Sequence, residues 1–391
     1  MKKTKNYLFL ILMLSSVILV LTSLNLSAGD ENRIFLGERV SFESKVLGED
    51  RTILVYLPES YGVSDLKYPV LYLLDGRSHF LHASGITQFL STVGSMPQTI
   101  VIAITNVDRS RDFSPTHVDN IPTSGGAEKF LAFLKKELIP FVDRNYRTSS
   151  YRMLAGHSFG GTFTTYAFLE EPSLFKGYIA ISPFLMFDDE MVVSLAEKKL
   201  KSAYDQVDFF MTIGNEPAYF ETLDRFKGIL DKKSPSGFNF SYTSYPEENH
   251  GSVPHLSIYN GLSSIFGGWK LPDDKFTEGL AAIDHHYEQL SKKFDYPIMT
   301  PESVINQLGY TYISKDSMKE AIEVFSSNVK RYPKSANVYD SLGEAYEKDG
   351  KMAEAMDNYS KAVQIAEKTG EANLELYKAN LERARELTAG K

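Results

Sequence analysis

Eight short strand-like runs alternate with helix-period segments between residues 40 and 245 of this 391-residue chain. The segments Gly126–Val142, Thr162–Leu169 and Tyr219–Leu230 are examples of the helical pattern. Strands that are almost wholly apolar and alternate with helices are typical of a mostly parallel sheet covered on both faces. We therefore expect an α/β domain over residues 33–270, with its ligand at the carboxyl ends of the strands. The strand-like runs are Val40–Val46, Thr52–Leu57, Val70–Leu74, Ile100–Ile104, Met153–Ala155, Tyr178–Ile181, Phe209–Ile213 and Phe238–Tyr245.

A different pattern, with a period of 34 residues, occupies the last part of the chain. Leu308, Gly309, Tyr312, Ala321 and Phe325 recur as Leu342, Gly343, Tyr346, Ala355 and Tyr359. This spacing matches the tetratricopeptide repeat, a helical pair that buries its apolar face by stacking on its neighbours. We expect a linker helix at residues 271–300 and helical repeats at 301–391. Residues 277–294 and 371–388 are the expected flanking or capping helices.

A Gly-x-Ser-x-Gly motif, followed by a second glycine, lies at residues 156–161. It follows the apolar run Tyr151–Ala155 and precedes a segment with helical periodicity, so the local order is strand, sharp turn, helix. This is the context of a nucleophile elbow, in which the flanking glycines allow a strained turn to present the serine above the sheet. Ser158 is therefore the candidate nucleophile.

A serine hydroxyl needs a base to take its proton. His250 lies in the loop directly after the last strand-like run, where its side chain can reach over the edge of the sheet. Three other histidines follow Ser158 in the chain: His255, His285 and His286. His255 follows Pro254 with no strand-like run directly before it, and the last two lie on the expected linker helix, so His250 is the candidate base.

The base in turn needs a carboxylate to orient it. Glu216 follows the run Phe209–Ile213 through the turn Gly214-Asn215, again at the carboxyl end of a strand. It is the candidate acid. Asp188, Asp189 and Asp224 are the alternatives that the sequence leaves open.

Two loops supply candidates for the rest of an active site. The oxyanion of an acyl-transfer reaction needs two backbone N–H donors, one of them on the residue after the nucleophile. We assign these to Phe159 and to Arg77 in the loop Asp75-Gly76-Arg77. Arg109, Arg111, Asp112 and His157 are candidates for contact with substrate, although Arg111 beside Asp112 could instead fix its loop through an ion pair.

Composition excludes several classes of site and indicates a location. The chain has no cysteine, which excludes disulfides, thiolate metal sites and a cysteine nucleophile. Its net charge of -8 argues against a nucleic-acid partner. His79, His82 and His117 lack the spacing of a metal-binding motif, so we expect neither metal nor cofactor.

Lysines before an apolar run in residues 1–28 predict a secretory signal peptide, with an uncleaved membrane anchor as the alternative. Either form places the remainder in the periplasm or outside the cell.

These motifs together resemble the enterochelin esterase and esterase D branch of the α/β-hydrolases, over residues 40–265. The resemblance rests on Tyr72–Gly76, Arg109–Thr116, Glu137–Pro140 with Tyr146–Thr148, Ala155–Gly161 and Glu248–Ser252. It implies an α/β-hydrolase fold, with Ser158, His250 and Glu216 as the triad and an oxyanion donor just after Gly76.

The resemblance predicts an exported serine carboxylic-ester hydrolase that works through an acyl-enzyme intermediate. Siderophore-type and aryl or acyl esters are the candidate substrates, and water is the favoured acceptor over a second alcohol. The alternatives are an acyltransferase, and a protein-binding module in which the helical repeats hold a peptide or protein and the hydrolase domain is a catalytically weak scaffold.

Overall fold

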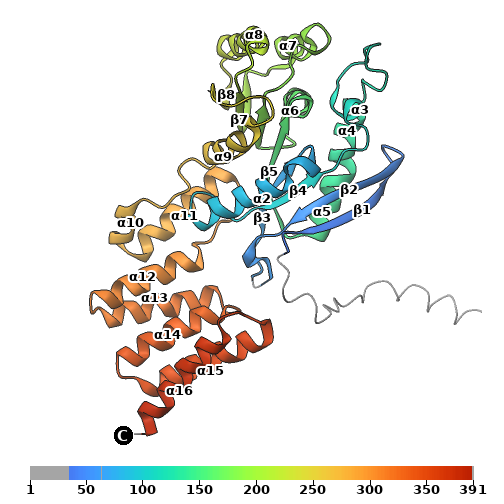
Figure 1. Cartoon of the computed structure of the whole chain (residues 1–391). Helices are drawn as coiled ribbons and strands as arrows, with labels where there is room; N and C mark the ends of the chain where they lie inside the picture. The colour runs from blue at the N-terminus through green and yellow to red at the C-terminus, as the bar shows by residue number, and fades with distance from the viewer. Residues whose placement is uncertain (1–34, 63, 390–391) are drawn as a thin grey trace, which may run out of the picture. The chain divides into compact units, whose positions relative to one another are not determined.

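A computed structural model describes residues 35–62 and 64–389, where one mixed sheet forms the centre of the α/β part (Figure 1). The predicted signal segment, residues 1–28, lies outside the described residues. All eight predicted strands are present. Their bounds are β1 Glu38–Ser44, β2 Glu49–Tyr56, β3 Tyr68–Leu73, β4 Ile100–Ile104, β5 Thr148–His157, β6 Gly177–Ile181, β7 Ala203–Ile213 and β8 Ser236–Ser244.

The strands follow the order β1-β2-β4-β3-β5-β6-β7-β8 across the sheet. β1 and β2 pair in antiparallel fashion, as do β2 and β4, whereas every pairing from β4 to β8 is parallel. Every residue of β3, β4 and β6 is buried, as expected for strands covered on both faces. The predicted α/β-hydrolase fold is confirmed, with an antiparallel β1–β2 edge.

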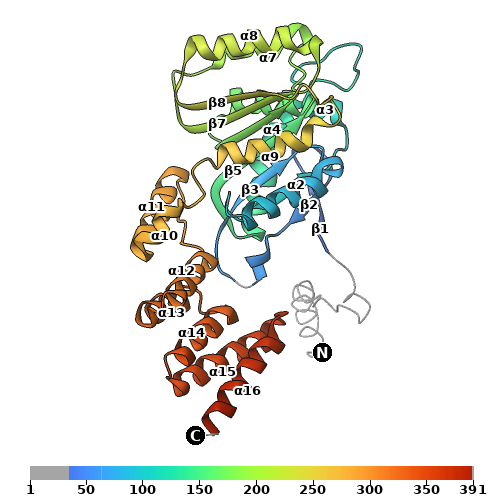
Figure 2. The same cartoon turned by 60° about the vertical axis from the view of Figure 1, so that its left-hand side comes forward.

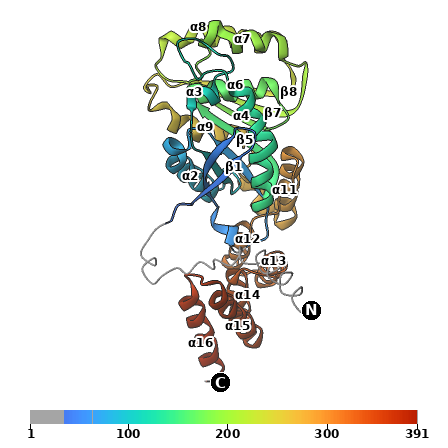
Figure 3. The same ribbon diagram turned by 90° about the vertical axis from the view of Figure 1, so that its right-hand side faces the viewer.

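Helices cover both faces of this sheet. Figures 2 and 3 show α2 and α9 together on one side and α4 and α6 on the other. The helical elements of this part are η1 Glu59–Gly62, α2 Gly76–Thr92, α3 Arg109–Phe113, α4 Ala127–Phe133, η2 Leu134–Leu138, α5 Ile139–Asn145, α6 Phe159–Glu170, α7 Phe187–Lys199, α8 Pro217–Lys233 and α9 Val253–Ile265.

The predicted helix over residues 126–142 is interrupted. It forms α4 and α5 with the π-helical segment η2 between them. Pro140, near the start of α5, has no N–H to donate, and its ring crowds the carbonyl one turn earlier. A wider turn just before a proline relieves that conflict, so the periodicity predicts the helix while the proline changes its winding.

The rest of the described chain is helical, as predicted. It comprises α10 Asp273–Glu278, α11 Leu280–Phe294, α12 Glu302–Ser314, α13 Met318–Arg331, α14 Ala336–Lys348, α15 Met352–Thr369 and α16 Leu374–Ala389. The repeated glycines have the same packing role in both repeats. A Cβ on Gly309 would lie 2.5 Å from the ring of Phe325, and one on Gly343 would lie 2.7 Å from the ring of Tyr359. Each helix pair therefore packs a ring directly on backbone, as the 34-residue period requires.

The linker helix α11 has contacts at both of its ends. Phe294 lies among Tyr151 and Phe266, with ring centroids 5.2 and 5.3 Å away. Asp284 accepts hydrogen bonds from both terminal nitrogens of Arg331, at 2.6 and 2.7 Å. The predicted domain limits at 33–270, 271–300 and 301–391 stay predictions. In residues 35–62 and 64–389, no helix has the length and apolarity needed to cross a bilayer.

Candidate active site

Ser158 lies on a strained turn between β5 and α6. Its φ of 60° and ψ of -120° put a non-glycine residue in a region that L-residues rarely adopt, at a cost of about 1–3 kcal/mol. The turn is held because Ser158 N–H donates to Ile181 O at 2.9 Å, and Thr162 N–H donates to Ser158 O at 2.9 Å. A Cβ on Gly156 would lie 2.3 Å from Gly160 O, so only glycine allows so sharp a turn. The backbone thus has the geometry of a nucleophile elbow.

His250 and Glu216 form a pair beside this turn. His250 Nδ1 lies 2.5 Å from Glu216 Oε1, and the Glu216 side chain is almost fully buried. The second carboxylate oxygen of Glu216, Oε2, accepts hydrogen bonds from Ser182 Oγ at 2.6 Å and from Gly214 N–H at 3.1 Å. With Nδ1 toward the carboxylate, Nε2 of His250 is the nitrogen left for a nucleophile.

The elbow and the pair are in contact through His157, the residue before Ser158. Its ring centroid lies 4.5 Å from that of His250. The loop that carries His250 lies over the turn after β7, where a Cβ on Gly214 would lie 2.8 Å from Glu248 O. Three strand ends, those of β5, β7 and β8, therefore contribute to one site. The catalytic roles of Ser158, His250 and Glu216 stay predictions.

The two assigned oxyanion donors lie in the first turns of helices. Phe159 is the first residue of α6 and Arg77 is the second residue of α2. Backbone N–H groups in a first helical turn have no acceptor within their own helix. The strands that precede these helices, β5 and β3, are neighbours in the sheet, so the donors come from adjacent strand ends. The geometry is compatible with the predicted oxyanion site.

Arg109 joins the turn between β3 and α2 to the turn between β5 and α6. Its Nε donates to Asp75 Oδ1 at 2.7 Å and its Nη2 donates to Asp75 Oδ2 at 2.9 Å. The same Nη2 donates to His157 O, in the elbow, at 3.0 Å. Asn106 also donates to Asp75, and Asp75 itself has a left-handed backbone with φ of 52°. A bidentate arginine thus holds the loop after β3, which carries the predicted oxyanion donor Arg77, against the elbow. Contact of Arg109 with substrate stays a prediction.

Arg111 and Asp112 belong to a separate buried ion-pair network. Arg111 donates to both carboxylate oxygens of Glu49, at 2.9 and 2.6 Å, and to Asp112 Oδ1 at 2.8 Å. The fully buried Arg51 also pairs with Asp112 and lies over the ring of Phe130. The hydrogen bond from Arg111 lowers the pKa of Glu49, whereas burial raises the pKa of Asp112. This is the ion-pair arrangement that the sequence left open, and contact of these two residues with substrate stays a prediction.

Aromatic rings line the other side of the elbow. Phe184 and Phe187 each lie 5.4 Å from the ring of Phe159, and Tyr219 lies 5.8 Å from Phe184 and 6.0 Å from His250. Phe159, Phe184 and Tyr219 are only partly buried. An apolar, ring-lined surface therefore lies next to the candidate nucleophile.

The start of α7, beside these rings, has an unusual backbone. Asp188, Asp189 and Glu190 have φ values of 48°, 49° and 62°. Thr116 Oγ1 donates to Asp188 Oδ2 at 2.5 Å, and Arg225 donates through Nε to Glu190 Oε2 at 2.8 Å. Asp188 is therefore occupied by Thr116 instead of by His250.

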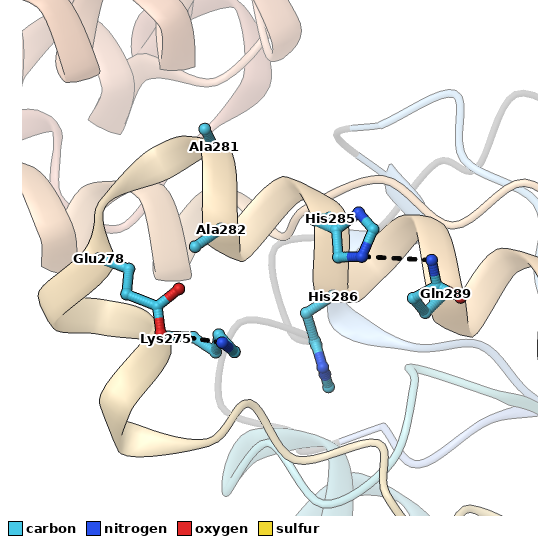
Figure 4. A pocket seen from close by; sticks show the side chains of 7 residues that line it. All are labelled: Lys275, Glu278, Ala281, Ala282, His285, His286 and Gln289. Carbon is cyan, nitrogen blue, oxygen red and sulfur yellow. Dashed lines mark hydrogen bonds and ion pairs between the residues drawn. The ribbon is translucent and has the colours of Figure 1, made fainter.

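The remaining alternatives lie in other places. His285 and His286 line a cavity of about 490 Å³ with Lys275 and Glu278, on α10 and α11 (Figure 4). Asp224, an alternative acid, accepts a hydrogen bond from Lys227 on the same helix, α8. Among residues 35–62 and 64–389, no three His, Cys, Asp or Glu side chains are arranged to hold a metal ion.

Sequence reasoning missed several residues that support the site. Ser182, which bonds Glu216, is fully buried and has φ of 38°. The sequence feature that could have identified Ser182 is its position at the carboxyl end of a buried strand, β6, because the candidate acid was also chosen from a strand end. Asp75 and Asn106 each lie two residues beyond the end of a strand, β3 and β4, but no motif links them to Arg109.

Removing the Arg109 clamp is expected to impair catalysis more than binding. In Arg109→Met the buried Asp75 carboxylate keeps only Asn106 as a side-chain donor, and the loop that carries Asp75 and Arg77 loses its link to the elbow. We expect kcat for ester hydrolysis to fall about tenfold to a hundredfold, and the free energy of unfolding to fall by about 1–3 kcal/mol. Steady-state kinetics and urea unfolding measure both. Arg152→Met is the matched control, because Arg152 on β5 pairs with Asp143 at 2.7 Å. Equal loss of kcat in both variants would contradict the clamp.

Comparison with known proteins gives two family matches. Residues 44–228 match the family described as "Putative esterase", and residues 336–369 match the tetratricopeptide repeat. A crystal structure of an IroE-like serine hydrolase from Shewanella oneidensis is 30% identical, with a TM-score of 0.67. The similarity covers 75% of this chain and 98% of that one.

Two curated relatives are similar over part of the chain. Ferri-bacillibactin esterase BesA of Bacillus subtilis is 30% identical over 38% of this chain and 62% of its own length. The siderophore enterobactin esterase of Emericella nidulans is 31% identical over 37% of this chain and 55% of its own length. This chain therefore spans less than two thirds of either relative.

Proposed function

Because this chain belongs to the enterochelin esterase-like serine hydrolases, we propose that it hydrolyses a siderophore-type ester through a triad of Ser158, His250 and Glu216. The observation that carries the proposal is the His250–Glu216 pair, at 2.5 Å, beside a serine held on a strained elbow. The chain is an esterase by family. The triad, the substrate and the site of action are the proposed parts.

The chemistry follows from the positions of the groups. Ser158 Oγ attacks the ester carbonyl carbon while His250 Nε2 takes its proton, and the Phe159 and Arg77 amides hold the resulting oxyanion. The C–O bond of the ester then breaks, and His250 returns the proton to the leaving alcohol. Water repeats the sequence on the acyl-enzyme and frees the carboxylic acid and Ser158. Glu216 keeps its charge throughout and stabilises the imidazolium.

Two observations support a siderophore ester as the substrate. Two relatives whose names give a siderophore ester as substrate, ferri-bacillibactin esterase and siderophore enterobactin esterase, are 30% and 31% identical to this chain over the matched residues. In addition, Phe159, Phe184 and Tyr219 offer a ring-lined surface where an aryl-bearing acyl group can pack beside Ser158.

A panel of esters tests the proposed substrate. We expect a catecholate trilactone to be hydrolysed with a higher kcat/KM than a feruloyl ester or an aryl acetate, measured by product chromatography. Addition of a primary alcohol should not divert the acyl group from water. A preference for the feruloyl or acetyl ester would reject the siderophore proposal and leave the esterase in place. An ester product with the added alcohol would favour an acyltransferase.

The location and the partner of the repeats are further proposals. The lysine-rich, apolar start of the sequence supports export to the periplasm or beyond, which amino-terminal sequencing of the mature protein tests. The repeats support a peptide or protein partner, because stacked helix pairs form extended binding surfaces.

A further inference from the structure

We propose that His157 and Tyr219 are positioning residues whose rings hold the imidazole of His250 in its catalytic orientation. This inference rests on the proposed triad. His250 lies in a loop, and 41% of its side chain is exposed. Glu216 fixes only one ring atom, Nδ1. The Cβ–Cγ bond and the hydrogen bond at Nδ1 hold the ring along one edge only, so neighbouring side chains help to set the direction of Nε2 on the opposite edge.

Two rings contact the imidazole from different elements. His157, at the end of β5, has its centroid 4.5 Å from that of His250, and Tyr219, in the first turn of α8, has its centroid 6.0 Å away. Both interplanar angles are 43°. A turn of the His250 ring towards either neighbour would bring it against that ring, so the two contacts limit its orientation on these two sides.

The two positioning rings are themselves held in place. The β5–β6 ladder pairs His157 with Ile181, and Arg109 donates to the His157 carbonyl. Tyr219 N–H donates to Glu216 O at 2.9 Å, and its ring lies 5.8 Å from that of Phe184. The elbow, the acid and the base are thus connected by side chains that do not themselves react.

His157 also has the right charge for this position. Burial, followed by His250 and His79, lowers the pKa of His157 to about 3, against the opposing effect of Asp75. The charged and titratable groups that face it are Asp75, His79, Arg109 and His250. A neutral ring adds no positive charge next to the imidazolium that forms on His250. A positive charge at that distance would oppose proton transfer from Ser158.

No hydrogen bond explains why His157 is a histidine. Its Nε2 is buried and has no partner among residues 35–62 and 64–389. An unpaired buried nitrogen is unfavourable for stability. We therefore infer that the ring acts on His250 through its shape and packing, while contact of His157 with substrate stays a prediction. Phenylalanine should therefore replace it with little loss of function.

The test compares ring-removing and ring-keeping variants. On a short aliphatic ester, which has no aryl group to pack on the rings, we expect His157→Ala and Tyr219→Leu to lower kcat about tenfold to a hundredfold, with KM nearly unchanged. His157→Phe and Tyr219→Phe should restore most of the rate. His157→Phe should also leave the acidic limb of the pH profile within about one pH unit of the wild type, because both side chains are neutral there.

His82→Ala is the matched control. His82 lies in the same row of rings, with its centroid 5.2 Å from His79 and 5.5 Å from His255, and it takes no part in the proposed contacts with His250. We expect its kcat to match the wild type. The inference is overturned if His157→Ala keeps wild-type kcat, or if His157→Phe is as slow as His157→Ala. Ser158→Ala separates the two proposals: activity retained in that variant rejects the triad, whereas an inactive Ser158→Ala with fully active ring variants rejects only the positioning role.

Discussion

Ser158→Ala is expected to lower kcat/KM for ester hydrolysis by about 10⁴-fold or more. The variant removes the atom that attacks the carbonyl but keeps the backbone of the elbow. The interactions that hold this turn are made by main-chain atoms, namely Ser158 N–H to Ile181 O and Thr162 N–H to Ser158 O. The melting temperature should therefore stay at the wild-type value, as measured by circular dichroism beside the kinetics.

Ser91→Ala is a suitable control for this variant. Ser91 lies near the end of α2, and its Oγ donates to Gln88 O at 2.9 Å, within the same helix. We expect its kcat/KM to equal that of the wild type. Retention of more than about 1% of the activity in Ser158→Ala would contradict nucleophilic catalysis at this residue.

Glu216→Gln is expected to lower kcat by about 10²–10⁴-fold, with a small change in KM. The amide keeps the size of the side chain but removes the charge that stabilises the His250 imidazolium. It can also present an N–H where His250 Nδ1–H needs an acceptor, which favours the wrong tautomer. Because Ser182 and Gly214 bond the other oxygen, the side chain cannot easily move away. Steady-state kinetics over a range of pH measure the effect.

Controls for the acid come from the same part of the chain. Glu221→Gln, on α8, removes an exposed charge that pairs with Arg225, and it should leave kcat unchanged. Asp188→Asn, Asp189→Asn and Asp224→Asn test the three alternatives that the sequence left open. A larger loss of kcat in any of these than in Glu216→Gln would reassign the acid.

The sequence predicted the parts of the molecule that depend on local periodicity. Each of the eight strands produces its own apolar run, and the 34-residue repeat reflects a ring packed on a glycine in each helix pair. The site candidates followed from the rule that parallel strands present their carboxyl ends at one edge. Glu216 and His250 satisfy that rule, and the structure places them 2.5 Å apart.

Features that depend on contacts between distant loops could not be predicted. The Arg109–Asp75 clamp joins residues 34 positions apart, and neither residue type specifies its partner. The left-handed run Asp188–Glu190 contains no glycine that would signal it in the sequence, and its two outer residues are held by contacts with the distant Thr116 and Arg225. The partner of Arg111 also depends on distant contacts. The sequence could not distinguish an ion pair with Asp112 from a guanidinium available to substrate.

Covalent labelling with a fluorophosphonate tests the central claim most directly. The reagent reacts with a serine that a neighbouring base activates, so the label reports the nucleophile and its base together. We predict one adduct per chain, mapped by mass spectrometry to the peptide that contains Ser158, with loss of esterase activity in proportion to labelling. His250→Ala should react far more slowly. Failure of the wild-type protein to label, or an adduct on another residue with activity lost in step, would contradict the account.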